Sequence, residues 1–407
     1  MAIISLVKVT LFGCSAAYLV LASPNNRTKT LLQQLWMPRV LLCAIAAFSL
    51  SLLWTQAASG FALVAFLKHA KLLGVVLLLV LIRDQREARL GLNCLLLGQV
   101  FALLSSWLMA ADVPLFWAVR PSGHLEGNPS SGHTGADGQY VPFAESYLDQ
   151  SIMFALSATV AWHLHHGSRA RRVAALFFVV AAVLNIFLLM QGRTAYVVVL
   201  ACAVLALYWQ APKRVRLWSM AVAPLCLIAL LLLVSGPFHS RVAAVIDELV
   251  QYREVPGTDS SVGARLGMWH RSLLAIESRP LSGYGVGGWL IASKEVQQTE
   301  VGSTLGASSS GNPHQEFLLW GVELGAAGIV LLIGLLAATV KDASNFSEAT
   351  RRCAVSVALV LGLTCLFNAP LYDDLLGDFI CVTLALLSAL GLHEGSSTVR
   401  VDRSDTK

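Results

Sequence analysis

Apolar runs of about twenty residues recur along the chain and are separated by polar segments. A bilayer core of about 30 Å needs about 20 apolar residues per helix, and helices satisfy the backbone hydrogen bonds that lipid cannot. The pattern therefore predicts an all-α fold, a polytopic transmembrane helical bundle of about eleven helices. The predicted spans are 3–22, 38–58, 60–82, 91–111, 148–167, 172–190, 194–210, 217–235, 317–340, 352–371 and 373–392.

Two long segments, near 112–147 and 236–316, interrupt this pattern. The first contains a stretch rich in Gly, Ser and Pro, which is typical of an irregular loop. The second is predicted to carry short helices, one of them over Ser261–Ser278, ahead of Pro280 and a glycine-rich run. The predicted organisation is transmembrane helices with the shorter loop over 1–235, the large loop over 236–316, C-terminal transmembrane helices over 317–392 and a tail over 393–407.

Lysine and arginine are concentrated in alternate connections between the predicted spans. Because cytoplasmic loops of membrane proteins are enriched in these residues, the clustered side is predicted to be cytoplasmic and both long loops to lie outside. The count places the N-terminus outside, unless a helix in the first hundred residues has been missed. The clusters are Arg27, Lys29 and Arg39; Arg83, Arg86 and Arg89; Arg169, Arg171 and Arg172; Lys213, Arg214 and Arg216; Lys341, Arg351 and Arg352; and Arg400, Arg403 and Lys407.

Composition supports a chain that faces lipid over much of its surface. The chain is 56% hydrophobic and only 13% charged, with a mean hydropathy of +0.67, whereas soluble domains carry about 25% charged residues. The net charge of +5 lies in short clusters without interleaved aromatic residues, so a nucleic-acid partner is not predicted. The eight cysteines include no C-x-x-C pair, so neither a disulfide framework nor a metal site is predicted.

Three arginines are candidates for binding an anionic group. Arg193 stands at the outer boundary between two apolar runs, where it either contacts lipid phosphate or binds a substrate anion at membrane depth. Arg265 and Arg271 lie on the predicted loop helix. The alternative interpretation is that this helix is an ordinary solvated amphipathic helix without a ligand. Guanidinium groups bind phosphate oxygens in bidentate fashion, so converging arginines would hold a diphosphate and stabilise it as a leaving group.

His314 is the candidate general base. It follows Asn312 and Pro313 at the head of a predicted helix, where the helix dipole disfavours the charged imidazolium and keeps a neutral proton acceptor. A helix-capping or interface histidine is the alternative. The sequence has no D-x-D, Walker, H-E-x-x-H or G-x-S-x-G motif, so a soluble nucleotide-dependent or metal-dependent enzyme is not predicted, and no cofactor is expected.

Four stretches resemble motifs of the O-antigen ligase and polymerase superfamily. They are Gln191-Gly-Arg-Thr, Arg265-Leu-Gly-Met-Trp-His, Pro280-Leu-Ser-Gly-Tyr-Gly-Val-Gly and Asn312-Pro-His-Gln-Glu-Phe. The resemblance is specific from about residue 190 to about residue 340, and the flanking helices agree mainly in number and hydrophobicity. Chain length and the single large late loop are most similar to the O-antigen ligases of Gram-negative bacteria.

The resemblance implies a glycosyltransferase of the bacterial inner membrane whose active site faces the periplasm. Such ligases transfer O-antigen from undecaprenyl diphosphate to a sugar hydroxyl of lipid A-core, with inversion and without a metal ion or cofactor. The resemblance also implies that Arg193 and Arg265 grip the diphosphate while His314 activates the acceptor hydroxyl. These ligases usually have twelve helices with both ends cytoplasmic, which is one helix more than the apolar runs predict.

Three other functions remain open at the level of sequence. An O-antigen polymerase and a protein O-oligosaccharyltransferase share the donor and the late loop but use a different acceptor. A lipid-linked glycan transporter or flippase would share the hydropathy. Transporters often show repeated halves and discontinuous helices at the midplane. The candidate residues instead gather on one face of the membrane.

Overall fold

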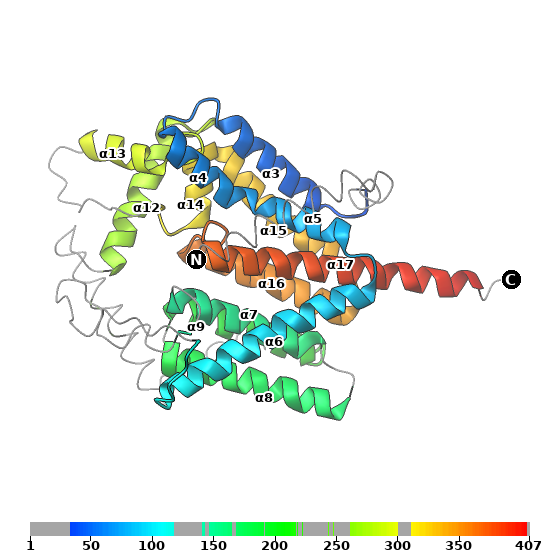
Figure 1. Ribbon diagram of the computed structural model, residues 1–407. Helices are drawn as coiled ribbons and strands as arrows, with labels where there is room; N and C mark the ends of the chain where they lie inside the picture. The colour runs from blue at the N-terminus through cyan, green and yellow to red at the C-terminus, as the bar shows by residue number, and fades with distance from the viewer. Residues whose placement is uncertain are drawn as a thin grey trace.

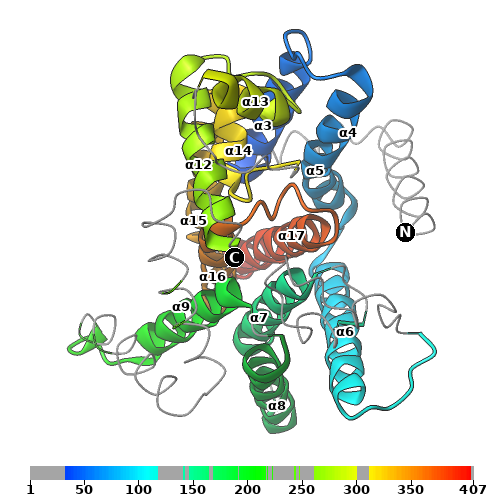
Figure 2. The same ribbon diagram turned by 90° about the vertical axis from the view of Figure 1, so that its left-hand side faces the viewer.

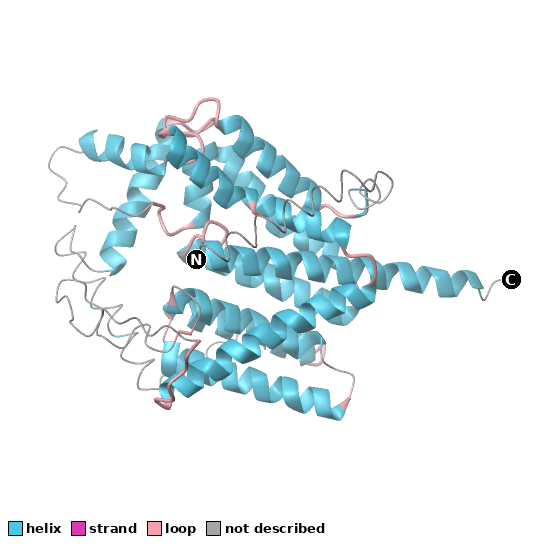
Figure 3. Ribbon diagram, viewed as in Figure 1, coloured by secondary structure: helices cyan, strands magenta, loops and turns pink. Residues whose placement is uncertain are grey.

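The computed structural model describes residues 33–117, 141–142, 146–164, 168–190, 192–216, 261–299 and 311–404, with Trp218, Val222, Ala243 and Asp247 as isolated positions. The predicted spans 3–22 and 217–235 therefore lie outside the continuously described ranges. Within these ranges the regular structure is helical, which confirms the predicted all-α class (Figure 3).

The described helices include seven stretches that are long and apolar enough to cross a membrane, so the chain is a polytopic membrane protein. These stretches are Ser59–Leu81, Gln85–Ala110, Arg169–Met190, Arg193–Gln210, Ala326–Ala343, Glu348–Phe367 and Asp374–Glu394. The elements are α3 (Met37–Ser51), α4 (Ser59–Ala70), α5 (Leu72–Leu81), α6 (Gln85–Ala110), α7 (Tyr147–Leu164), α8 (Arg169–Asn185), the π-helix η1 (Ile186–Met190), α9 (Arg193–Gln210), α12 (Ser261–Ser278), α13 (Trp289–Thr299), α14 (Glu316–Leu324), α15 (Ala326–Ala343), α16 (Glu348–Phe367) and α17 (Asp374–Ser404).

Basic connections from distant parts of the sequence meet at one end of the bundle, which we call the basic end (right in Figure 1). Glu394 of α17 accepts hydrogen bonds there from Arg89 (3.3 Å) and from the Thr350 hydroxyl (2.7 Å). The Lys341 ammonium lies 3.9 Å from the centre of the Trp36 ring, at the start of α3. The opposite end carries α12 and α13, the helices of the predicted large loop (Figure 1).

Several of the predicted spans have different boundaries in the structure: α3 ends at Ser51, short of the predicted 58, and the predicted span 60–82 is divided into α4 and α5. The prediction of one helix over 317–340 was wrong, because Gly325 adopts a φ of +66° and separates α14 from α15. The Ala326 amide donates 2.7 Å to the Pro280 carbonyl, so the break is stabilised by a distant segment that an apolar run does not reveal. The last helix, α17, continues beyond the predicted span into the segment predicted as a tail.

The glycine-rich run after α12 forms a tight turn that docks on the end of α14. Gly283, Gly285 and Gly287 have φ values of +62°, +81° and +74°, which residues other than glycine rarely adopt. The Gly285 amide donates 2.9 Å to the Glu323 carbonyl, and the Gly287 amide donates 2.8 Å to Glu323 Oε1. The glycines therefore serve a close approach of backbone to α14, which fixes the end of α12.

Gly283→Ala is expected to destabilise the folded protein. The left-handed backbone costs about 1–2 kcal/mol for an alanine, and the added Cβ would lie 2.6 Å from the Glu323 carbonyl. The melting temperature in detergent, followed by tryptophan fluorescence, should fall by several degrees. Gly98→Ala is the control, because no neighbouring heavy atom lies within 4 Å of a Cβ at Gly98. Equal melting temperatures for both variants would contradict this account of the turn.

Candidate functional site

Helices α12 and α14 pack against each other at the end opposite the basic end. This packing brings Arg265 into electrostatic range of His314. Figure 2 views this end directly, with α12, α13 and α14 above the ends of α16 and α17. One face of α12 is buried, including Met268 and Ala275, and packs against the rest of the fold. Arg265 lies on the same helix and is half-buried.

His314 sits in a strained turn immediately before α14. Its φ is +50°, a left-handed conformation in which histidine is more common than most residues. The Asn312 side chain accepts a 2.8 Å hydrogen bond from the His314 amide, a local turn typical of asparagine. Gln315 then caps the helix, since its side-chain oxygen accepts 2.6 Å from the Leu318 amide. The sequence Asn-Pro-His-Gln thus fixes the backbone of His314 through local hydrogen bonds.

Burial lowers the pKa of His314, and the nearby positive charge of Arg265 lowers it further. Both effects disfavour the imidazolium, so the ring is neutral at pH 7. A neutral imidazole accepts a proton, which is the property predicted for a general base. The structure therefore places Arg265 within electrostatic range of His314.

Glu316 fastens the start of α14 to the segment that follows α16. Its amide donates 3.0 Å to the Asn368 carbonyl, and its carboxyl accepts from the Trp320 indole (2.8 Å) and the Leu371 amide (2.9 Å). The side chain is fully buried, and burial raises the pKa of Glu316 to about 8. A carboxylate in a first helical turn ordinarily faces solvent, so sequence reasoning missed this inward contact.

Arg193 lies at the same end of the bundle as α12, although on a different helix. It is the first residue of α9, whose other end lies at the basic end. There the centre of the Trp209 ring lies 5.0 Å from that of the His163 ring, edge to face, and 5.9 Å from the Arg352 guanidinium. Sixteen residues at 1.5 Å each separate Arg193 from Trp209 by about 24 Å. Gly192 packs against Ser151 near the start of α7. Gln191 lies outside the described residues.

Arg271 differs from the other two arginines in its surroundings. It is only 2% exposed and shares the buried face of α12 with Met268 and Ala275. A diphosphate would have to enter between α12 and its neighbours to touch this side chain. Its role in diphosphate binding therefore stays a prediction, as do the roles of Arg193, Arg265 and His314.

A mixed-charge cluster borders this region from the side of α4 and α17. Lys71 interrupts the helix between α4 and α5, and its ammonium donates 2.6 Å to the Asp373 carbonyl and lies 3.7 Å from Asp374. The Lys68 ammonium lies 4.6 Å from the centre of the Tyr372 ring. The sequence signals of this cluster were Lys68 and Lys71, inside the predicted span 60–82, and the aspartates Asp373 and Asp374, which follow some 300 residues later.

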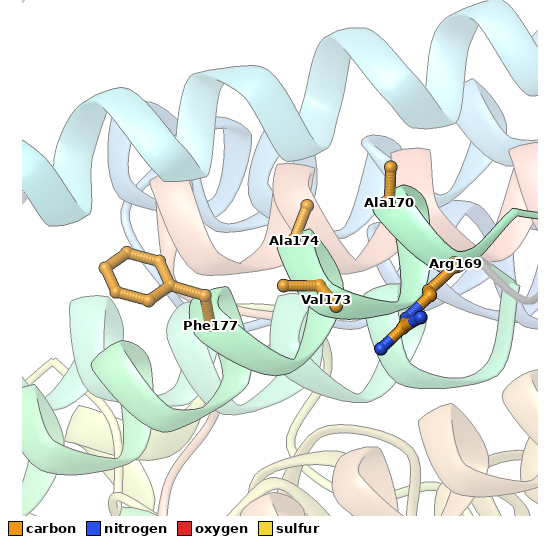
Figure 4. Close-up of a pocket in the computed structure, with 5 residues that line it drawn as sticks. All are labelled: Arg169, Ala170, Val173, Ala174 and Phe177. Atoms are coloured by element: carbon orange, nitrogen blue, oxygen red, sulfur yellow. The ribbon is translucent and has the colours of Figure 1, made fainter.

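A cavity away from these residues lies along α8. It has a volume of about 730 Å³ and is lined by Arg169, Ala170, Val173, Ala174 and Phe177 of α8, so it begins at the basic end (Figure 4). Its lining is apolar apart from Arg169 and contains none of the candidate residues. In the part of the chain that the structure describes, no three His, Cys, Asp or Glu side chains are grouped as metal ligands.

Comparison with known proteins points to one family. Residues 177–333 match the family model described as O-antigen ligase, a stretch that runs from α8 into α15 and includes Arg193, Arg265 and His314. An uncharacterized protein of Haemophilus influenzae is 26% identical over 228 residues, which cover 54% of this chain and 57% of that protein. The chain thus spans just over half the length of this relative. The family match supports a membrane glycan ligase or polymerase type of function.

Proposed function

We propose that the protein is an O-antigen ligase, a glycosyltransferase of the bacterial inner membrane. It transfers O-antigen polysaccharide from undecaprenyl diphosphate to a sugar hydroxyl of lipid A-core. In this proposal the basic end faces the cytoplasm, in keeping with the positive-inside rule, and α12 and α14 lie on the periplasmic side. The match of residues 177–333 to the O-antigen ligase family supports this class of reaction.

The reaction is a direct displacement at the anomeric carbon of the first sugar. His314 accepts the proton of the acceptor hydroxyl, whose oxygen forms a bond to that carbon from the face opposite the diphosphate. The bond between the carbon and the diphosphate oxygen breaks, and its electron pair leaves with the lipid diphosphate. Arg193 and Arg265 meet the negative charge that develops on the leaving group. The configuration at the anomeric carbon is inverted.

One observation carries this proposal: a half-buried histidine lies within electrostatic range of an arginine, at the end of the bundle opposite the basic connections. The Arg265 charge and burial both lower the pKa of His314, so the base is ready at neutral pH. The same arginine is half-buried. A helix-capping histidine would need neither a cationic neighbour nor this degree of burial.

Reconstitution of the full chain in lipid vesicles tests the reaction and the acceptor together. Purified undecaprenyl-diphosphate-linked O-antigen and lipid A-core are supplied on the side of α12, without nucleotide sugar and in the presence of a metal chelator. The expected products are O-antigen attached to lipid A-core and an equal amount of free undecaprenyl diphosphate.

Each competing function gives a different product in the same vesicles. Longer glycan on the carrier lipid, with none on lipid A-core, would identify a polymerase. Glycan on a serine or threonine of an added acceptor protein would identify an oligosaccharyltransferase. Movement of the lipid-linked glycan between leaflets without a new glycosidic bond would identify a flippase. Any of these three results in place of the ligase product overturns the proposal.

A further inference from the structure

Glu316 is a buried carboxyl group to which the proposed reaction assigns no role. Its side chain is 0% exposed, in a position that begins α14 and follows His314 by two residues. Burying a carboxyl group is costly unless hydrogen bonds satisfy it. The partners that satisfy Glu316 therefore indicate what its burial accomplishes.

Both carboxyl oxygens of Glu316 face nitrogen donors. Oε1 accepts 2.8 Å from the Trp320 indole nitrogen, one helical turn later on α14. Oε2 accepts from the backbone amides of Leu371 (2.9 Å) and Tyr372 (3.4 Å), in the segment between α16 and α17. The backbone amide of Glu316 itself donates 3.0 Å to the Asn368 carbonyl. Three of these four bonds join the first residue of α14 to a segment more than fifty residues away.

Glu323 provides an internal comparison on the same helix. It follows Glu316 by seven residues, so the two carboxyl groups share one face of α14, and it is also buried, at 1% exposure. Its oxygens accept from the Gly287 amide (2.8 Å) and contact His69 Nε2 (2.7 Å). Glu323 therefore holds the end of α14 that is remote from His314, while Glu316 holds the end beside it.

We propose that Glu316 is a positioning residue that fixes the backbone of His314 against the 368–372 segment and thereby keeps the imidazole beside Arg265. This inference rests on the proposed function for the role of His314 in the reaction. The turn at His314 has a strained left-handed φ of +50°, and strained conformations persist only where the surroundings hold them. Asn312 holds the turn on one side, and Glu316 holds it on the other.

The chemistry of the site explains why a carboxyl group is needed at this position. When ionised, Glu316 accepts through both oxygens, which matches donors on both sides, and the hydrogen bonds from Trp320 and Leu371 favour this ionised form against the burial that raises the pKa. Glutamine has the same shape, but its NH₂ group must face either the Trp320 indole or the two backbone amides, and donor then opposes donor. Glu316→Gln should therefore loosen the connection while leaving the volume of the side chain unchanged.

The test compares Glu316→Gln with Glu323→Gln in the full chain, since both remove a buried carboxyl group from α14. The first readout is the pH dependence of His314 modification by diethyl pyrocarbonate, measured by peptide mass spectrometry, because only neutral imidazole reacts. In Glu316→Gln the imidazole should move away from the burial and the Arg265 charge that lower its pKa. The midpoint of His314 modification should therefore lie at higher pH than in the wild type. Glu323→Gln should keep the wild-type midpoint even if its melting temperature falls.

The second readout is the transfer reaction itself. A misplaced base lowers kcat by about tenfold to a hundredfold, with little change in the KM for the lipid-linked donor. If Glu316→Gln does not fold, Trp320→Phe removes a single donor to the same carboxyl and should shift the His314 midpoint in the same direction. A wild-type midpoint and kcat in the folded Glu316→Gln variant, or equal midpoint shifts in both glutamine variants, would overturn the proposal. The midpoint of His314 modification is measured without glycan transfer. Failure of the proposed function can therefore be distinguished from failure of this inference.

Discussion

Replacing His314 is expected to reduce glycan transfer by about 10²–10⁴-fold, the usual contribution of a positioned general base. His314→Asn is the informative variant, because asparagine tolerates the left-handed backbone at a φ of +50°, whereas alanine would add about 1–2 kcal/mol of strain. The asparagine amide cannot accept the hydroxyl proton. Initial rates in vesicles, at saturating donor and acceptor, measure the loss as a fall in kcat.

The pH profile of the wild-type protein provides a second check on the same residue. The pKa of His314 lies below its ordinary value of about 6.5, so the active neutral form persists as the pH falls through 6.5. Activity should decline only at lower pH, as the imidazole becomes protonated. His393→Ala, at the basic end where the ring contacts the Ile82 carbonyl, should keep the wild-type rate and profile. A folded His314→Asn protein with wild-type activity would remove the proposed base.

The bundle itself was predictable because hydrophobic length is a strong constraint in a membrane. Runs of about twenty apolar residues predicted the helices α6, α8 and α16, and most of the ends of these helices lie within a few residues of the predicted ones. The division of one run into α14 and α15 was not predictable in the same way. Gly325 is chemically compatible with a continuous apolar helix, and the turn there depends on a hydrogen bond from the amide of its neighbour to Pro280. Hydropathy reports burial in lipid and carries no information on such contacts.

The candidate site was predictable only in part, and for a chemical reason. An arginine at a membrane boundary, an arginine on a loop helix and a histidine at a helix start made Arg193, Arg265 and His314 candidates by residue type. The resemblance to the O-antigen ligase and polymerase superfamily is what assigned them roles. Glu316 was not a candidate, because an acidic residue in a first helical turn is favourable to the helix dipole and needs no further explanation. Its structural role comes from backbone amides of Leu371 and Tyr372, and backbone donors have no sequence signature.

Lys68 and Lys71, inside the predicted span 60–82, have two interpretations from the sequence: they snorkel to the interface, or they mark a break in the apolar run. Lys71 is buried, and its ammonium is satisfied by the Asp373 carbonyl and lies close to Asp374. A charged residue in a membrane span pairs with a partner or lines a polar region, but the partner's place in the sequence cannot be read from the lysine. The structure supplies that partner from the start of α17.

Removing the charge of Arg265 should have two effects that separate its two roles. Arg265→Gln deletes a group proposed to grip the diphosphate, and each charge-assisted hydrogen bond contributes about 1.5–3 kcal/mol. This range corresponds to a loss of about tenfold to 150-fold in kcat/KM per bond. The same change removes a positive charge that lowers the pKa of His314, so the His314 pKa should rise and protonation should occur at higher pH.

Arg265→Lys distinguishes these effects because it keeps the charge and removes the bidentate fork. The lysine variant should lose transfer activity while the midpoint of His314 modification by diethyl pyrocarbonate stays near its wild-type value. The glutamine variant should lose activity and shift that midpoint to higher pH. An unchanged midpoint in Arg265→Gln would mean that this guanidinium does not act on the imidazole. Wild-type kcat/KM in both variants would mean that groups other than Arg265 hold the leaving diphosphate. That result would contradict the proposed reaction, in which the Arg265 guanidinium stabilises the leaving group.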